Sequence, residues 1–184
     1  MSSLTQFKSR LTGGGVRGNQ FQVFLTFPTF AGDATNAGKD LEFLCTATGL
    51  PAQNIGTTDV KFRGRTLHLA GDSRTFEDWS ITVLNDDFTI YRAFEQWQDG
   101  INNMIDNTGA VNPDHYKSSG TVHQLDRAGR SIKEYRFEGI FPTSIGTVAL
   151  SMDTDDTIET FDVTLAVDYF TTKDVHVASG GAPS

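Results

Sequence analysis

The chain has a single cysteine, Cys45, among its 184 residues. One thiol cannot form an internal disulfide, and without a second thiol a cysteine-rich metal site is disfavoured. Cys45 is therefore expected to be a small core side chain in a fold stabilised by packing. No apolar run reaches the roughly 20 residues of a membrane-spanning helix, so we expect no membrane insertion. The first residues also lack the pattern of a secretory signal, which predicts synthesis in a cytoplasm.

Positive charge is scarce. The chain carries 15 Lys and Arg against 23 Asp and Glu, with a formal net charge of −8 and a pI near 4.8. Proteins that bind nucleic acid tightly neutralise phosphates with lysine and arginine. High-affinity binding of DNA or RNA is therefore disfavoured.

Motifs that carry chemistry are also missing. The glycine run 13–15 lacks the Gly-Lys-Ser/Thr ending of a phosphate-binding loop, and the acidic stretch 153–156 lacks the glycine and final glutamate of an EF-hand. No two histidines stand at ligand spacing: His68, His115, His123 and His176. Neither a nucleophile motif nor a paired acid and base is visible. We expect no cofactor, no metal and no enzymatic activity.

Hydrophobic periodicity divides the chain into one domain and two flexible ends. Residues 1–18 hold four glycines and little apolar pattern, so we expect an arm that becomes ordered only against a neighbour. The domain is expected over residues 19–170, and residues 171–184 are expected to form a flexible tail. A length of this size suits one domain.

Within the domain, apolar and polar side chains alternate with the two-residue period of half-buried strands. The alternation predicts strands over residues 21–27, 41–48, 78–84, 121–125, 135–141 and 161–169. A polar loop is expected between the first two. Apolar segments at 60–62 and 66–69 flank Arg63, Gly64 and Arg65, a pattern that predicts a projecting hairpin with its tip in water.

One helix is expected over about residues 86–106. Apolar residues recur there at three- and four-residue spacing: Phe88, Tyr91, Phe94, Trp97, Ile101, Met104 and Ile105. Such a stripe is far more often core than a ligand-binding box. The pattern therefore predicts a mainly β fold, an antiparallel β-sandwich or half-open barrel with one flanking α-helix.

A series of short motifs resembles a known family. They are residues 19–23 (NQFQV), 45–51 (CTATGLP), 74–79 (RTFEDW), 92–97 (RAFEQW), 124–129 (QLDRAG), 135–145 (YRFEGIFPTSI) and 159–163 (ETFDV). In this order they resemble the tail tube proteins of contractile-tailed bacteriophages, over about residues 19–170.

The resemblance implies a structural virion protein of the tail, related in fold to phage and type VI secretion tube subunits. It implies hexameric rings stacked into a hollow tube inside a contractile sheath, through which viral DNA enters the host. Implied partners are other copies of the chain, the sheath protein, the tape measure protein and baseplate tube initiators. The acidic balance suits a conduit that lets DNA pass without tight binding, because repulsion acts over a Debye length of about 8–10 Å.

The resemblance also implies where subunits touch. The projecting segment 50–69 would contact the next ring, and the glycine-rich arm would become ordered at a subunit boundary. The candidate contact residues are Leu50, Pro51, Arg63, Gly64, Arg65, Arg74 and Arg17.

Other functions remain open at this point. A tube subunit of a tailocin or of a type VI secretion system would share the architecture, although the Leu-Asp-Arg and Phe-Pro-Thr motifs at 125–127 and 141–143 favour the phage version. A monomeric β-barrel that binds a small ligand belongs to a different class. An enzyme is the least supported reading.

Overall fold

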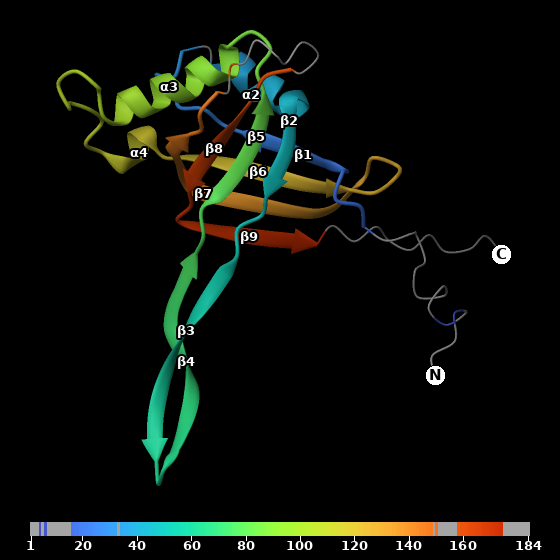
Figure 1. Ribbon diagram of the computed structural model, residues 1–184, viewed down its shortest axis with the longest axis vertical. Helices are drawn as coiled ribbons and strands as arrows, with labels where there is room; N and C mark the ends of the chain where they lie inside the picture. The colour runs from blue at the N-terminus through green and yellow to red at the C-terminus, as the bar shows by residue number, and fades with distance from the viewer. Residues whose placement is uncertain are drawn as a thin grey trace.

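The computed structural model describes residues 16–32, 34–148, 150 and 158–174, together with Leu4 and Gln6. Most of the expected arm 1–18, and residues 175–184 of the expected tail, lie outside these described residues. The elements in chain order are β1 (Phe21–Leu25), α2 (Ala34–Leu44), β2 (Cys45–Gly49), β3 (Gln53–Phe62), β4 (Arg65–Phe76), β5 (Trp79–Leu84), α3 (Thr89–Ile101), α4 (Pro113–Tyr116), β6 (Ser118–Leu125), β7 (Ser131–Ile145), β8 (Thr160–Ala166) and β9 (Tyr169–Asp174) (Figure 1).

The long strand β7 belongs to two antiparallel sheets. Its first half pairs with β6 and β9, and β6 pairs in turn with β1, which makes the first sheet. Its second half pairs with β8, which continues through β5 to β2 and makes the second sheet. In Figure 1 the strands of the two sheets run crosswise to each other. The expected antiparallel β architecture is confirmed.

The turn of β7 from one sheet to the other occurs at Gly139. Its φ of +67° lies in the left-handed region, and a Cβ there would sit 2.1 Å from the Asp168 Oδ2 atom. Asp168 lies between β8 and β9, and its carboxylate forms an ion pair with Lys117, in which the Nζ and Oδ2 atoms are 2.6 Å apart. Only glycine suits both the backbone conformation and the close approach, so Gly139 fixes the corner of the sandwich.

The core lies between the two sheets. Trp79 on β5 stacks on Phe137 on β7, with ring centroids 4.4 Å apart. On the neighbouring strands β5 and β8 of the second sheet every second side chain is buried: Trp79, Ile81, Val83, Phe161, Val163 and Leu165. The Trp79 indole N–H donates to the Thr48 hydroxyl at 2.8 Å, so burial of the ring leaves no unpaired donor.

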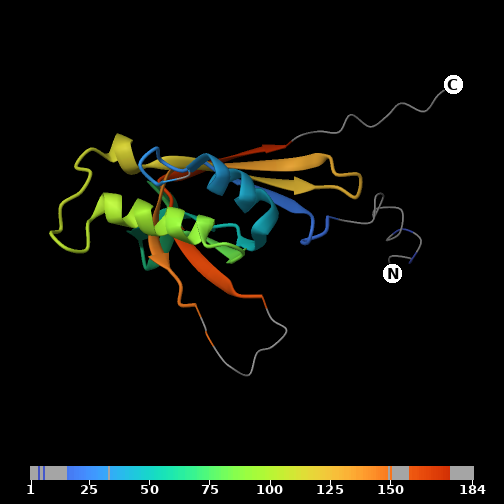
Figure 2. The same cartoon turned by 90° about the horizontal axis from the view of Figure 1, so that it is seen from above.

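Helices α2 and α3 close one end of the sandwich, opposite the β3–β4 hairpin (Figures 1 and 2). Helix α3 buries Phe94 and Trp97, and both rings meet Phe27 edge-on. The Trp97 indole N–H donates to the Tyr116 carbonyl at 2.7 Å. The aromatic stripe of α3 is therefore core, as the helical spacing indicated.

The helix expected over 86–106 is shorter at both ends. Phe88 precedes α3 in a left-handed conformation, with φ of 62°, and α3 ends at Ile101. Beyond it the Asp99 carboxylate accepts from the Asn103 amide and from the Met104 backbone N–H. These side-chain bonds compete with helical ones. Met104 and Ile105 therefore lie in an exposed loop, and their assignment to the core face was wrong.

Helix α2 replaces an expected loop and half of an expected strand. The strand predicted over 41–48 exists only from Cys45 onward, because residues 34–44 are helical. Ala34, Ala37, Leu41 and Leu44 face the core at helical spacing, whereas Phe43 is 78 % exposed. The β-branched and aromatic run after Leu41 obscured this weak helical pattern.

The ordered domain also extends past Phe170. Residues 169–174 form β9, an edge strand paired with β7 from Tyr169↔Glu138 to Asp174↔Lys133. Its last four residues are polar and carry no burial pattern, which is why residues 171–174 were wrongly placed in a flexible tail. The strand expected over 161–169 is likewise interrupted at the corner beside Gly139.

The corner gives a stability prediction. Gly139→Ala should lower the free energy of unfolding of the unassembled subunit by about 2–4 kcal/mol, because left-handed strain and collision with Asp168 add. Gly129 has a similar φ of +75° but open space around it. Gly129→Ala should therefore cost only about 1–2 kcal/mol. Urea denaturation measures the free energy of unfolding of both variants. Equal losses would contradict the role assigned to Gly139 at the corner.

Candidate assembly surfaces

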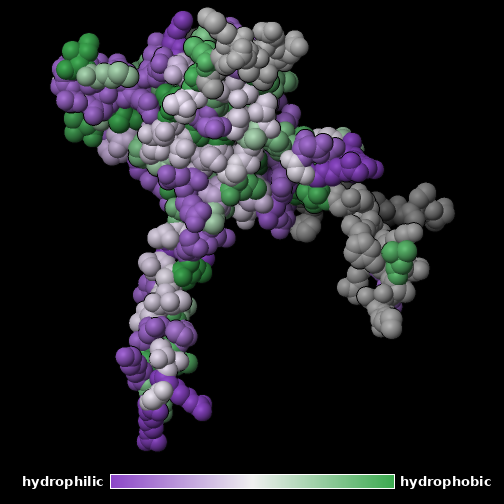
Figure 3. All heavy atoms as spheres, viewed as in Figure 1, coloured by the Kyte–Doolittle hydropathy of each residue, from purple (hydrophilic) through white to green (hydrophobic). Residues whose placement is uncertain are grey.

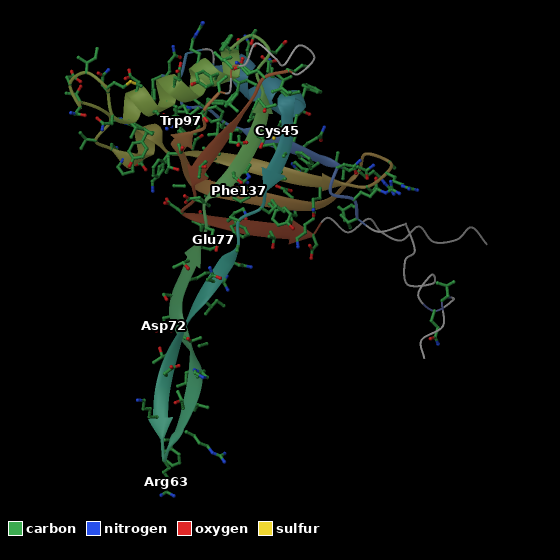
Figure 4. The ribbon with its side chains drawn as sticks, viewed as in Figure 1. Cys45, Arg63, Asp72, Glu77, Trp97 and Phe137 are labelled. Atoms are coloured by element: carbon green, nitrogen blue, oxygen red, sulfur yellow. The ribbon has the colours of Figure 1, made fainter. Side chains whose placement is uncertain are left out.

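The β3–β4 hairpin projects away from the sandwich. Arg63 and Gly64 form its two-residue turn with φ of 46° and 80°, as a tight hairpin turn requires. In Figure 4 Arg63 marks the tip, Asp72 lies midway and Glu77 lies at the base. The projecting hairpin expected from the sequence is present.

The two faces of this hairpin differ in chemistry. Val60 is paired with Leu67 and Thr58 with Leu69, so these four side chains share one face. Val60, Leu67 and Leu69 are 43 %, 57 % and 46 % exposed. The opposite face carries charged and polar groups, including Asp59 and His68 in a 2.5 Å contact. A two-stranded ribbon has no core of its own, so its apolar face is left open to solvent.

The outer face of the second sheet is lined with small hydroxyl side chains. Register and exposure place on it Ala47, Ser80, Thr82, Ser144, Asp162 and Thr164. The Thr82 hydroxyl donates to Asp162 at 2.6 Å, and the Thr143 hydroxyl donates to the Thr164 carbonyl. Neither lysine nor arginine occurs in β2, β5, β8 or residues 141–145, and Asp162 is their one charged residue. The outer face of the first sheet, in contrast, carries both signs of charge: Arg136, Lys173, Glu134 and Glu138.

Both sheets have free edges among the described strands. The first sheet ends at β1 and β9, and the second at β2 and the last residues of β7. Exposed edges present unpaired N–H and C=O groups that favour pairing with another chain. A heterologous ring of identical subunits satisfies such edges by joining each to the next copy.

Two features are absent from the described residues, a cluster of metal-ligating side chains and a helix that could span a bilayer. Within them no group of three or more His, Cys, Asp or Glu could hold a metal ion. No helix in the described part of the chain is both long and apolar enough to span a bilayer. Burial raises the pKa of the Cys45 thiol to about 11, against a smaller lowering by the Ala47 backbone. That thiol therefore stays protonated at neutral pH.

The expected contact residues fall into two groups. Arg63, Gly64 and Arg65 lie together at the hairpin tip. Arg74 stands opposite Ile55 nearer the base, and Leu50 and Pro51 connect β2 to β3. Leu50 lines a pocket of about 220 Å³ with Gly18, the residue after Arg17. The structure therefore separates a tip group from a base group.

Two surfaces were not predicted from the sequence: the hydroxyl face of the second sheet and the exposed loop that holds Met104 and Ile105. The hydroxyl face of the second sheet was hidden because Ser and Thr alternate with core residues without any motif. Met104 and Ile105 were assigned to the helix core, although Asn102 and Asn103 signal a local end to the helix.

Solved structures share this fold. A chain of an extracellular contractile injection system, solved as a PVC sheath-tube complex in the extended state, superposes with a TM-score of 0.56 at 16 % identity, over 95 % of this chain and 100 % of that one. A chain of the anti-feeding prophage baseplate gives 0.59 at 9 % identity, over 88 % and 97 %. The fold is thus that of the subunits from which contractile injection systems are built.

The sequence comparisons narrow this class. The family model described as phage tail tube protein matches residues 16–173. The tail tube protein gp19 of Enterobacteria phage T4 is 38 % identical over 164 residues, which cover 86 % of this chain and 93 % of that protein. The chain therefore belongs to the phage tail tube protein family.

Family membership confirms the function expected from the motifs. The chain is a structural protein of the virion tail, a subunit of the tail tube and not an enzyme. The surfaces described above are accordingly surfaces for assembly.

The exposed hairpin gives a prediction about dynamics. In the unassembled subunit, amides of residues 57–70 should exchange with deuterium much faster than those of β5 and β8, because a lone two-stranded ribbon is marginally stable. Hydrogen exchange followed by mass spectrometry resolves these segments. Equal protection of hairpin and core would show that the hairpin is stabilised within its own subunit.

Proposed function

We propose that this subunit closes into six-membered rings that stack into a hollow tube, with the β3–β4 hairpin of each subunit packed on the neighbouring ring. The observation that carries the proposal is the apolar face of a hairpin that projects clear of its own sandwich (Figure 1). Sixfold symmetry is supported by the family resemblance and by the anti-feeding prophage baseplate, which was solved with sixfold symmetry.

Hydrophobic burial supplies the energy for stacking. Val60, Leu67 and Leu69 stand side by side on one face of the hairpin. Each is already about half covered in the single subunit, so complete burial by a partner contributes roughly half of the about 1.5–3 kcal/mol that a fully exposed side chain would gain. Several such contacts around a ring add up to a strong axial interaction. The polar face, with Asp59 and His68, remains in water.

The outer face of the second sheet is the surface best suited to line the channel. Passing DNA presents phosphates, which lysine and arginine would hold by releasing counterions. The hydroxyl groups and Asp162 of this face offer no cation. A channel wall of this kind lets viral DNA slide through during ejection, and before ejection it would enclose the tape measure protein.

The outside of the tube would then be covered by the sheath, and baseplate proteins would start its growth. The structural neighbours support both partners by analogy, because one comes from a sheath–tube complex and the other from a baseplate. The first sheet, with Arg136 and Lys173 on its outer face, would point away from the channel.

A pair of neighbouring substitutions tests the stacking role. Leu67→Asp places a charge on the apolar face of the hairpin, and Thr66→Asp places the same charge on the polar face. Leu67→Asp should stop assembly at single rings, whereas Thr66→Asp should still give tubes in negative-stain electron microscopy. Tubes of normal length from Leu67→Asp would contradict the proposed contact.

Labelling of assembled tubes tests which sheet lines the channel. In a Cys45→Ala background, Ser80→Cys places a thiol on the second sheet and Thr171→Cys places one on the first. A bulky maleimide polymer should react with tubes carrying Cys at 171 but not with tubes carrying Cys at 80, while a small maleimide should label both. The reverse protection pattern would place the first sheet inside.

A further inference from the structure

The loop between α3 and α4, residues 102–112, carries an exposed apolar tip. Met104, Ile105 and Val111 are 82 %, 93 % and 96 % exposed. The loop lies at one end of the sandwich, at the left in Figures 1 and 2, and hydrophobic atoms are visible there in Figure 3. Nothing in the fold of a single subunit needs these side chains.

Internal hydrogen bonds hold this loop in one shape. The Asn103 N–H donates to the Thr108 carbonyl at 2.8 Å, and the Asn107 N–H donates to the Asn103 carbonyl at 2.9 Å. The Ala110 N–H donates to the Gly100 carbonyl at 3.0 Å. A loop ordered in advance presents its apolar side chains without an ordering cost on binding.

The surroundings of the loop are acidic. The chain has neither lysine nor arginine between Arg92 and Lys117, while Asp99, Asp106 and Asp114 lie in that span. The Thr108 hydroxyl and backbone N–H donate to Asp106 and lower its pKa below the usual range. Asp106 is therefore ionised at neutral pH, and the loop end of the sandwich is negative.

The opposite end of the sandwich carries an arginine without an ion pair beside an apolar pocket. The β6–β7 turn lies at the right in Figures 1 and 2 and holds Arg127, Arg130 and Asp126, while Lys133 beyond it pairs with Asp174. Arg130 is paired with Asp126 at 2.8 Å, whereas Arg127 is exposed and has no ion pair among the described residues.

The pocket stands next to this turn, as the bond from the Leu125 N–H to the Gln20 carbonyl shows. It is lined in part by Phe21, Leu50 and Val122, and it measures about 220 Å³. This volume and lining suit one aliphatic side chain.

We propose that the loop tip of one subunit docks beside the β6–β7 turn of the next copy in the ring, with the Ile105 side chain in the pocket, Met104 at its rim and the acidic loop facing Arg127. The inference rests on the proposed ring. Because the two surfaces lie at opposite ends of one subunit, the contact is heterologous and repeats around the ring until it closes. It complements hairpin stacking, which acts between rings.

Two substitutions at exposed apolar residues test the contact. Ile105→Asp would carry a charge into the apolar pocket, so the concentration needed for ring formation should rise by at least about tenfold. Phe43→Asp changes another highly exposed apolar residue, 78 % exposed and outside the interface, and should assemble like the wild type. Sedimentation velocity measures assembly, and thermal denaturation of the unassembled subunits should show both variants folded. Normal assembly of Ile105→Asp would overturn the inference.

Cross-linking locates the contact directly. In the Cys45→Ala background, Ile105→Cys with Leu50→Cys should give on oxidation a ladder of oligomers that ends at the closed ring, since these residues are too far apart to join within one subunit. Each single-cysteine variant should give dimers at most. A missing ladder would overturn the inference. Occupation of the pocket by residues 1–15 of the same chain is one arrangement that would give this negative result.

The outcomes separate this inference from the proposed function. If wild-type rings and tubes form but the ladder is absent and Ile105→Asp assembles, the loop contact is wrong and the tube proposal stands. If the wild-type chain forms no ring even with its baseplate initiators, the proposed function itself fails.

Discussion

The passage of β7 through both sheets is the constraint on which the rest of the structure depends. At Gly139 the strand leaves β9 and turns toward β8, and the Lys117–Asp168 pair holds the opposing corner between β8 and β9. This bend brings Phe137 onto Trp79 and creates the core between the sheets. Because the sheet folds over without closing into a barrel, it keeps free edges, and free edges favour assembly.

The same constraint separates the working surfaces of the subunit. Strands β2 and β5 belong to the second sheet, and the chain between them continues outward as β3 and β4. The hairpin is thus rooted in the sheet whose outer face lacks cations, while the helices cover the opposite end of the sandwich. In the assembly proposed above, the hairpin makes the contact between stacked rings. The loop tip and the pocket, at the two ends of the sandwich, make the contact within a ring, and the hydroxyl face lines the channel.

The sequence predicted the elements whose burial is periodic and missed those stabilised by other means. Strand β5 and the apolar face of α3 were readable because Trp79, Ile81, Phe94 and Trp97 repeat at strand or helix spacing. Helix α2 was missed because small residues supply half of its buried face, and β9 was missed because an edge strand of polar residues has no pattern. Met104 and Ile105 continued the helical period past the true end of α3, so local Asp and Asn hydrogen bonds outweighed hydrophobic spacing. The hairpin tip at Arg63–Arg65 followed from turn chemistry, whereas its link to a neighbouring ring came from resemblance, because a partner leaves no trace in the spacing of one chain.

Helical reconstruction of assembled tubes by electron cryomicroscopy tests the central claim most directly, because one density map shows every interface at once. The account predicts a channel lined by the second sheet, with Ser80 and Asp162 facing inward and the apolar face of each hairpin buried against the adjacent ring. A map with Arg136 and Lys173 facing the channel, or with the hairpins folded against their own subunits, would contradict it.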